Sequence, residues 1–174
     1  MPELEIHHEG HENDPVGKRI GILAAVLAVG LAVVTIASHR THTAAIIHKS
    51  NSNDEWSHYQ STRLKYHNLE LGENIISVLG QKSEAAEKML ADYAGQKKKY
   101  DEQGKELQEK AQHADELAEA DEHRAMRYDL GEGLLEIGLV LSSLYFISRK
   151  RMFPVMGLIG GIGGLAIAVT GFLM

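Results

Sequence analysis

The chain has 174 residues, of which 24% are charged and 44% hydrophobic, and its formal net charge is −6. This acidic balance argues against a nucleic-acid partner, because phosphate binding needs clustered positive charge. The absence of cysteine excludes disulfides, thiolate metal sites and cysteine nucleophiles.

Residues 1–17 form an acidic tail with five Asp or Glu residues and no Lys or Arg. Three histidines, His7, His8 and His11, lie among these carboxylates and together offer ligands for a zinc or nickel ion. A flexible tail supplies no preformed geometry for a metal. We therefore expect a solvated, disordered tail and no metal or cofactor.

Three long apolar runs predict three transmembrane helices. Ile20–Ser38 and Met152–Met174 contain no charged residue, and Leu130–Ser148 contains only two glutamates. A helix needs about 20 mostly apolar residues to cross a hydrocarbon core of roughly 30 Å. The first run is longer than the core of a signal peptide, which favours an anchor over a cleaved leader. We assign the three transmembrane helices to residues 18–39, 130–149 and 150–174.

Basic residues determine the predicted orientation. The second and third runs are separated only by Arg149, Lys150 and Arg151, which predicts a tight helical hairpin with its turn on the cytoplasmic side. Lys18 and Arg19 then lie on that side, before the first helix. The predicted cytoplasmic side has five basic residues next to the spans, and the other side has four. This difference is narrow, but long loops are translocated largely regardless of charge. We expect a cytoplasmic N-terminus, with residues 40–129 and the C-terminus on the opposite side of the membrane, which is the periplasm if the chain is bacterial.

Residues 40–129 predict long helices outside the membrane. All three prolines lie outside residues 16–153, and the segment is rich in strong helix formers. A capping-box pattern at Ser52–Glu55 favours a helix break there. The chain must reverse between the first two spans, and glycines mark 80–83 and 95–97 as the candidate turns. The predicted fold is an all-α membrane protein with an antiparallel helical segment between its first and second spans.

A seven-residue repeat runs through residues 86–128 and predicts a coiled coil. One position of the repeat is small four times in succession, whereas Lys97 and Asp121 interrupt the repeat. The alternative is a solvent-exposed helix in which alanine reflects helix propensity alone. Two such helices share little core, so we expect self-association into a stalk or bundle. The small positions are Gly104, Ala111, Ala118 and Ala125, and the first arm offers Trp56, Tyr59, Tyr66, Leu71, Ile75, Val78 and Leu79 to that interface.

Two carboxylates lie inside the second apolar run. Glu136 is about 9 Å beyond Leu130 at 1.5 Å per residue, and a carboxylate at that depth is a functional hypothesis because it is costly in lipid. Glu132 lies one turn earlier on the same face, so the pair is predicted to share a proton or bind a cation at the mouth of an oligomeric pore. The alternative is that both side chains are interfacial and reach water.

Small residues recur at four-residue spacing in the third run. Gly157 pairs with Gly161, Gly160 pairs with Gly164, and Ala168 extends the second pair. Such ridges allow close helix packing in lipid. A pore-lining glycine face is the alternative, and the spacing leaves open whether the partner helix belongs to the same chain.

Four short segments carry a family resemblance: HENDPVGKR at 11–19, ASHRTH at 37–42, NDEWSHYQ at 53–60 and SRKRMFP at 148–154. Over nearly the whole chain they resemble the bacterial family of unknown function numbered 4337. The order of tail, span, helical segment and two-span hairpin also matches. The resemblance implies a multi-pass protein of the bacterial inner membrane, and it supplies no catalytic residues.

The sequence contains no GxSxG elbow, no HExxH helix and no glycine-rich phosphate loop, so we expect no enzyme. The preferred function is a structural or scaffolding protein that self-associates and organises other envelope proteins. The alternative is a small oligomeric channel or transport accessory in which Glu132 and Glu136 line a polar path. The expected partners are the lipid bilayer and further copies of the chain.

Overall fold

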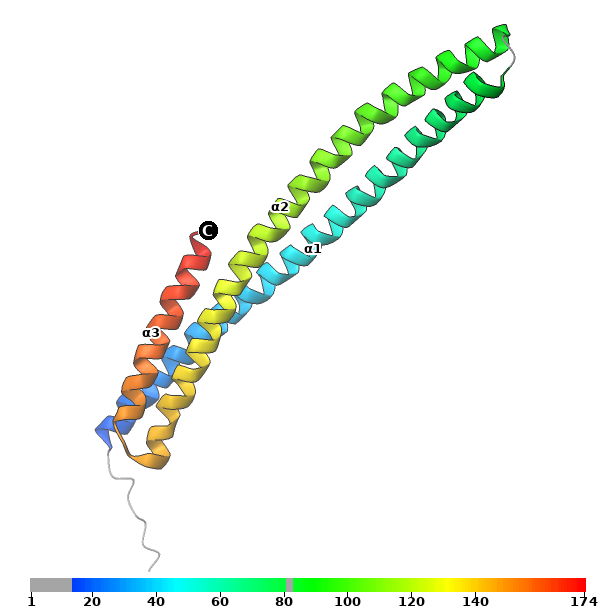
Figure 1. Ribbon diagram of the computed structural model, residues 1–174. Helices are drawn as coiled ribbons and strands as arrows, with labels where there is room; N and C mark the ends of the chain where they lie inside the picture. Colours follow the sequence, from blue (N-terminus) through cyan, green and yellow to red (C-terminus); the bar gives the residue numbers. More distant parts are fainter. Residues whose placement is uncertain (1–13, 81–82) are drawn as a thin grey trace, which may run out of the picture. The chain divides into compact units, whose positions relative to one another are not determined.

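The computed structural model describes residues 14–80 and 83–174. It contains three α-helices: α1 (Pro15–Leu79), α2 (Glu84–Ser148) and α3 (Met152–Phe172), shown in Figure 1. The described residues form no β-strand. Each helix includes a segment long and apolar enough to cross a membrane. The predicted all-α fold with three membrane-spanning helices is confirmed.

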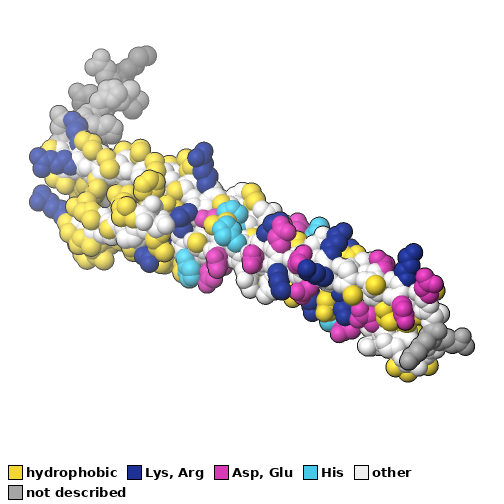
Figure 2. Space-filling view, turned by 90° about the horizontal axis from the view of Figure 1, so that it is seen from above, with side chains coloured by type: hydrophobic (Ala, Val, Ile, Leu, Met, Phe, Trp, Pro, Cys, Tyr) yellow, Lys and Arg dark blue, Asp and Glu magenta, His cyan; other side chains and the backbone are white. Residues whose placement is uncertain are grey.

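The helices form two compact units. The three-helix unit contains residues 15–41 of α1, residues 123–148 of α2 and all of α3, and the two-helix unit contains the described residues between 42 and 122. Hydrophobic side chains cover the visible face of the three-helix unit in Figure 2, whereas charged side chains of both signs cover that of the two-helix unit. The surface chemistry of the two units is therefore suited to lipid and to water, respectively.

Side-chain caps define the starts of the two long helices. The Asp14 Oδ1 atom accepts hydrogen bonds from the backbone N–H groups of Val16 and Gly17, both at 3.0 Å. Pro15 follows as the first helical residue, a position where its missing N–H costs nothing. At the start of α2, the Ser83 hydroxyl accepts a hydrogen bond from the Ala86 N–H at 3.2 Å. Both caps satisfy backbone donors that a helix leaves unpaired.

The chain reverses at the first of the two predicted turns. Helix α1 ends at Leu79, and the N–H of Gly80 donates to the Ile76 carbonyl at 2.9 Å. A side chain at residue 80 would collide with that carbonyl oxygen, which explains the glycine. The second predicted turn does not form, because α2 continues through residues 95–97.

The predicted helix break at Ser52–Glu55 is wrong, since α1 is continuous through these residues. Ser52 is fully buried, although it was expected to cap an exposed helix start. Polar residues of this type favour a cap only where the local hydrogen bonds compete successfully with the helix. Here the packing of α1 overrides the local preference.

The core of the three-helix unit lies where all three helices meet. Leu27 and Val34 of α1, Tyr128 and Leu135 of α2 and Ala168 of α3 form one buried cluster. Leu135 is completely inaccessible to solvent. Leu23, Leu31 and Leu139 pack against this cluster, whereas many other large apolar side chains of the unit are exposed, as they are in membrane-spanning bundles.

Candidate functional site

The two predicted intramembrane carboxylates have different surroundings. The Glu132 Oε1 atom accepts a hydrogen bond of 2.7 Å from the Thr35 hydroxyl of α1. Glu136, one turn further along α2, has an exposed side chain. Helix α1 thus contacts the side chain of Glu132, whereas the side chain of Glu136 on the same face of α2 remains exposed.

A second polar contact joins the same two helices. The Ser38 hydroxyl donates to Asp129 Oδ1 at 2.6 Å, and Ser38 is buried. Together with the Thr35–Glu132 bond, this contact places hydroxyl donors of α1 opposite carboxylates of α2 on two successive turns. Hydroxyl-to-carboxylate bonds are charge-assisted and stronger than neutral ones, so both bonds favour one register of α1 against α2.

The predicted glycine ridge of α3 packs against α2 of the same chain. Gly157, Gly161, Gly164 and Ala168 are all buried. A Cβ atom built on Gly164 would lie 2.6 Å from the Gly131 carbonyl oxygen, which shows backbone-to-backbone contact. Gly160 is less confined, because its Cβ atom would lie 3.5 Å from the Leu134 carbonyl oxygen, an ordinary contact distance.

The matching glycines on α2 were not identified from the sequence. A Cβ atom on Gly131 would lie 2.8 Å from the Gly164 carbonyl oxygen, and one on Gly138 would lie 2.7 Å from that of Gly157. These two residues are seven apart in the second apolar run. Their spacing was the available signal, because it equals the seven-residue separation of their partners Gly157 and Gly164 on α3.

The seven-residue repeat of α2 coincides with its least exposed positions. Gly104 and Ala111 are buried in the two-helix unit, and Ala118 is 6% exposed there. Ala125 is fully buried in the three-helix unit. On α1, Trp56, Tyr59 and Tyr66 are half-buried, whereas Leu71, Ile75, Val78 and Leu79 are at least 50% exposed.

Both interruptions of the repeat are paired with α1. The Asp121 carboxylate lies 3.0 Å from His48 Nδ1. Lys97 Nζ lies 2.6 Å from Glu73 and 5.3 Å from the centre of the Tyr66 ring. The bond to Glu73 raises the pKa of Lys97 above its ordinary value of 10.5. An ion pair and a histidine–carboxylate contact therefore occupy the two positions that the hydrophobic pattern leaves unfilled.

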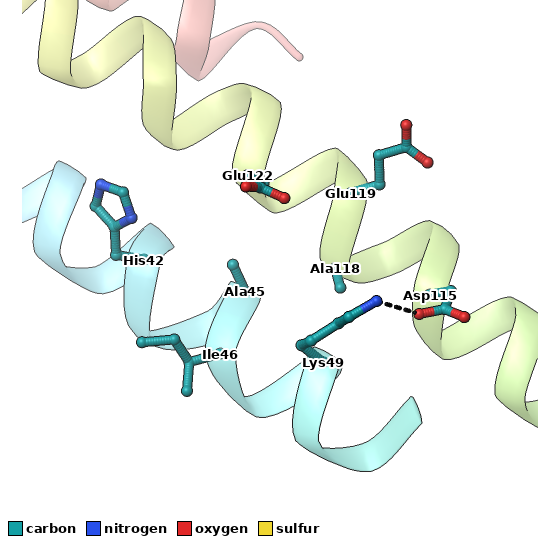
Figure 3. Close-up of a pocket in the computed structure, with 8 residues that line it drawn as sticks. All are labelled: His42, Ala45, Ile46, Lys49, Asp115, Ala118, Glu119 and Glu122. Atoms are coloured by element: carbon teal, nitrogen blue, oxygen red, sulfur yellow. Dashed lines mark hydrogen bonds and ion pairs between the residues drawn. The ribbon is translucent and has the colours of Figure 1, made fainter. Parts of the chain in front are cut away.

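A groove of about 740 Å³ opens between α1 and α2 in the two-helix unit (Figure 3). The groove is open where α1 and α2 carry the small side chains of Ala45 and Ala118, while His42, Glu119 and Glu122 lie along its rim. At one end Lys49 Nζ donates to Asp115 Oδ1 at 2.9 Å. The groove thus combines an acidic rim with one paired lysine.

Asp115 is held by two donors from α1. Lys49 bonds one carboxylate oxygen, and the Trp56 indole N–H donates to the other at 2.9 Å. The Lys49 bond, followed by the Trp56 bond, lowers the pKa of Asp115 from 3.8 to about 2. Asp115 is therefore ionised at neutral pH. Trp56 was predicted as an interface residue of the first arm, but His48, Lys49 and Asp115 were not predicted, because isolated polar residues on two separate helices give no sequence pattern.

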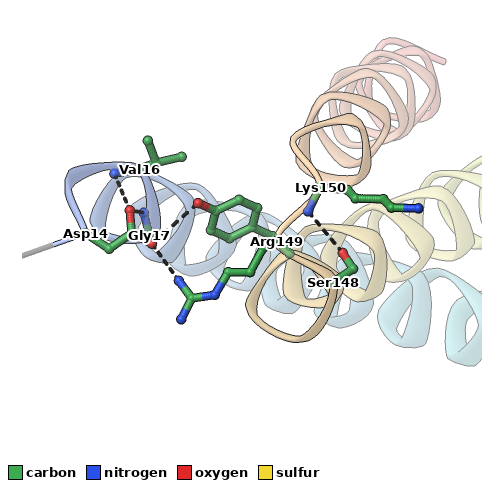
Figure 4. A network of polar contacts seen from close by, with 7 residues as sticks. Asp14, Val16, Gly17, Ser148, Arg149 and Lys150 are labelled. Atoms are coloured by element: carbon green, nitrogen blue, oxygen red, sulfur yellow. Dashed lines mark hydrogen bonds and ion pairs between the residues drawn. The ribbon is translucent and has the colours of Figure 1, made fainter. Parts of the chain in front are cut away.

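The predicted topology residues lie at one end of the three-helix unit (Figure 4). Arg149 donates to Asp14 Oδ2 at 2.9 Å, and the Tyr145 hydroxyl lies 3.4 Å from the same oxygen. The hydrogen bond from the Gly17 N–H is the main cause that lowers the pKa of Asp14, and Arg149 adds to it. This contact joins the start of α1, near Lys18 and Arg19, to the turn formed by residues 149–151.

Arg149 also makes the turn between α2 and α3. Its φ angle of 56° is in the left-handed region, which ends α2 at Ser148. The Lys150 N–H then donates to the Ser148 hydroxyl at 3.3 Å, and α3 begins at Met152. A non-glycine residue adopts this conformation at a cost of roughly 1–2 kcal/mol.

The histidine tail, with His7, His8 and His11, lies outside the described residues. Within residues 14–80 and 83–174, no three His, Asp or Glu side chains are grouped so that they could hold a metal ion. The described part of the chain offers polar contacts between helices and a polar groove.

Comparison with known proteins gives one finding. Neither a curated protein nor a solved structure matches the chain. A family model described as "Domain of unknown function (DUF4337)" matches residues 16–174, which include all three helices except the first residue of α1. The resemblance read from the short segments is confirmed, and the chain belongs to the DUF4337 family.

Proposed function

We propose that the protein is a non-enzymatic structural protein of the bacterial inner membrane that self-associates and organises other envelope proteins. In this proposal, Lys18, Arg19 and the turn at residues 149–151 lie in the cytoplasm. Residues 40–129 and the C-terminus lie in the periplasm. The proposal that it is not an enzyme is supported by the absence of a catalytic motif from the sequence.

The observation that carries the proposal is an apolar stripe on α1 in the two-helix unit. The stripe consists of Leu64, Leu71, Ile75 and Val78, which are 62%, 59%, 50% and 80% exposed. Their spacing of seven, four and three residues places them on one face of a helix. Burying one such side chain contributes roughly 1.5–3 kcal/mol, so a stripe left in water is a favourable docking surface.

A second copy of the chain is the proposed occupant of the stripe. The seven-residue repeat of α2 and the glycine ridge of α3, on which self-association was first predicted, are buried within one chain. The interface must therefore use other residues, and the stripe keeps a seven-residue period that a second long helix can follow. Two identical stripes are self-complementary about a two-fold axis.

Size-exclusion chromatography with light scattering in mild detergent tests this proposal. The double variant Leu71→Ser, Ile75→Ser should shift the protein from an oligomer to a monomer, with helical circular dichroism unchanged. Leu117→Ser is the matched control, because Leu117 is 40% exposed in the same unit but lies on α2. A wild-type monomer, or an oligomer that survives the double substitution, would refute self-association through the stripe.

The exposure of Glu136 favours a second candidate function, a small oligomeric channel or transport accessory. A carboxylate inside an apolar span is costly when it faces lipid, and assembly of several copies would surround it with protein or water. In that assembly Glu136 lines a polar path, and Glu132 supports it from the Thr35 side. Cation flux into liposomes should then fall for Glu136→Gln and stay unchanged for the control Glu119→Gln. Equal flux in both variants would leave only the structural proposal.

A further inference from the structure

We propose that the three-helix unit binds one phospholipid, with an acyl chain in a groove between α1 and α3 and the phosphate at the arginines near its mouth. The groove has a volume of about 330 Å³. Gly30, Val33 and Ala37 line one wall, Leu165 and Phe172 line the other, and Tyr128 of α2 forms part of its floor.

The lining of the groove selects a hydrocarbon. Apart from the Tyr128 hydroxyl, every lining side chain is aliphatic or aromatic or is a glycine. Water would find too few hydrogen-bond partners there, and an empty groove would forfeit the dispersion contacts of its walls. The walls belong to segments apolar enough to cross a membrane, so lipid chains are the solvent that meets them.

The size of the groove favours a lipid chain over another helix. From Gly30 to Ala37 the wall is about 10 Å long at 1.5 Å per residue, whereas a helix with its side chains is itself about 10–12 Å wide. The groove of about 330 Å³ holds only part of such a cylinder. A flexible chain enters it without displacing α3.

Two arginines lie one helical turn beyond residues that line the groove, and their charge complements a phosphate. Arg40 follows the lining residue Ala37 by three positions, and Arg124 precedes Tyr128 by four, so each shares a helix face with a lining residue. Arginine binds phosphate through a planar fork of N–H donors. Asp129 bonds Ser38 near this end, and the carbonyl end of α3 is partly negative. Both of these groups repel a phosphate. The phosphate must therefore contact the guanidinium groups directly to be held at this end.

The test is native mass spectrometry of the full chain released from detergent in the presence of phosphatidylglycerol or diacylglycerol. The wild type should retain one phosphatidylglycerol. Gly30→Leu should weaken this binding by about tenfold or more, because the new side chain enters the groove beside Leu165, whose Cδ2 would lie 3.3 Å from its Cβ. Gly163→Leu is the matched control, since a Cβ atom there meets nothing within 4 Å.

A second pair of variants tests the phosphate contact without filling the groove. The double variant Arg40→Gln, Arg124→Gln should lose the preference for phosphatidylglycerol over diacylglycerol, and Arg151→Gln at the other end should keep it. Equal lipid retention in Gly30→Leu and Gly163→Leu would overturn the groove assignment. A preference that survives the double arginine substitution, or binding of inorganic phosphate alone, would overturn the phospholipid assignment. A change of oligomeric state in Gly30→Leu with unchanged lipid retention would show that a second copy fills the groove.

Discussion

The contact between α2 and α3 in the three-helix unit differs in kind from the contact between α1 and α2 in the two-helix unit. In the three-helix unit, α2 and α3 touch through glycine backbones, so that a Cβ atom at Gly138 or Gly157 would collide with the other helix. In the two-helix unit, α1 and α2 are joined by ion pairs such as Lys97–Glu73 and Lys49–Asp115. The difference follows the solvent. Lipid provides no hydrophobic drive between helices, so close packing must hold them, whereas water allows charged seams between long amphipathic helices.

The largest expected effect comes from adding one methyl group to the glycine contact. A Cβ atom at residue 138 would lie 2.7 Å from the Gly157 carbonyl oxygen and 3.1 Å from the Gly161 nitrogen. Because both neighbours are backbone atoms, Gly138→Ala should separate α2 from α3 at a cost of about 1–3 kcal/mol. Thermal unfolding in detergent, followed by circular dichroism, measures the change.

Gly133→Ala is the control for this prediction. It lies on the same helix, and a Cβ atom there meets nothing within 4 Å. The control should therefore be neutral or slightly stabilising, because alanine has the higher helix propensity. If both substitutions had the same effect, backbone contact would not be what joins α2 to α3.

A smaller effect is expected from the charged seam at low pH. The folded-state pKa of Asp115 is about 2, below its ordinary value of 3.8. Its contribution to stability is therefore complete above pH 3.8 and is lost as the pH falls towards 2. The contact with Trp56, the single tryptophan of the chain, makes indole fluorescence a local probe.

Asp115→Asn should remove this acid dependence of the Trp56 signal and leave the neutral-pH structure helical. Glu116→Gln, which changes an exposed carboxylate on the same helix, should retain it. We expect a modest amplitude, because the ion pair is partly exposed and screened. An unchanged acid transition in Asp115→Asn would assign the transition to other carboxylates.

The sequence was sufficient for the elements and much of the packing pattern. Run lengths predicted the three apolar helices, the glycine at residue 80 marked one of two candidate turns, and the seven-residue frame of α2 selected the positions that are least exposed. These features are local or periodic along one helix. Each is set by propensity and by the geometry of a single helix.

The sequence did not predict which residues of one helix contact which residues of the next. Glu132 and Glu136 are equivalent in helical spacing, and only the position of α1 distinguishes them. The capping pattern at Ser52 was misleading because tertiary burial outweighed it. The contacts of Gly131 and Gly138 were missed because a glycine allows two helices to touch through their backbones only where the opposing helix also has a glycine.

The smallest expected change in stability comes from Gly104. It tests whether α1 and α2 are further apart in the two-helix unit than α2 and α3 are in the three-helix unit. A Cβ atom at Gly104 would lie 3.7 Å from Arg63 Cδ and 3.8 Å from Tyr59 Cε2, both ordinary contact distances. Gly104→Ala should therefore stabilise the two-helix unit by roughly 0.5–1 kcal/mol through helix propensity, measured by thermal unfolding with Trp56 fluorescence. Gly95→Ala, whose Cβ meets nothing within 4 Å, gives the propensity gain alone. A loss of stability in Gly104→Ala beside a gain in Gly95→Ala would mean that α1 and α2 approach at residue 104 as closely as α2 and α3 do at residue 138. The contrast between the units would then rest on charge alone.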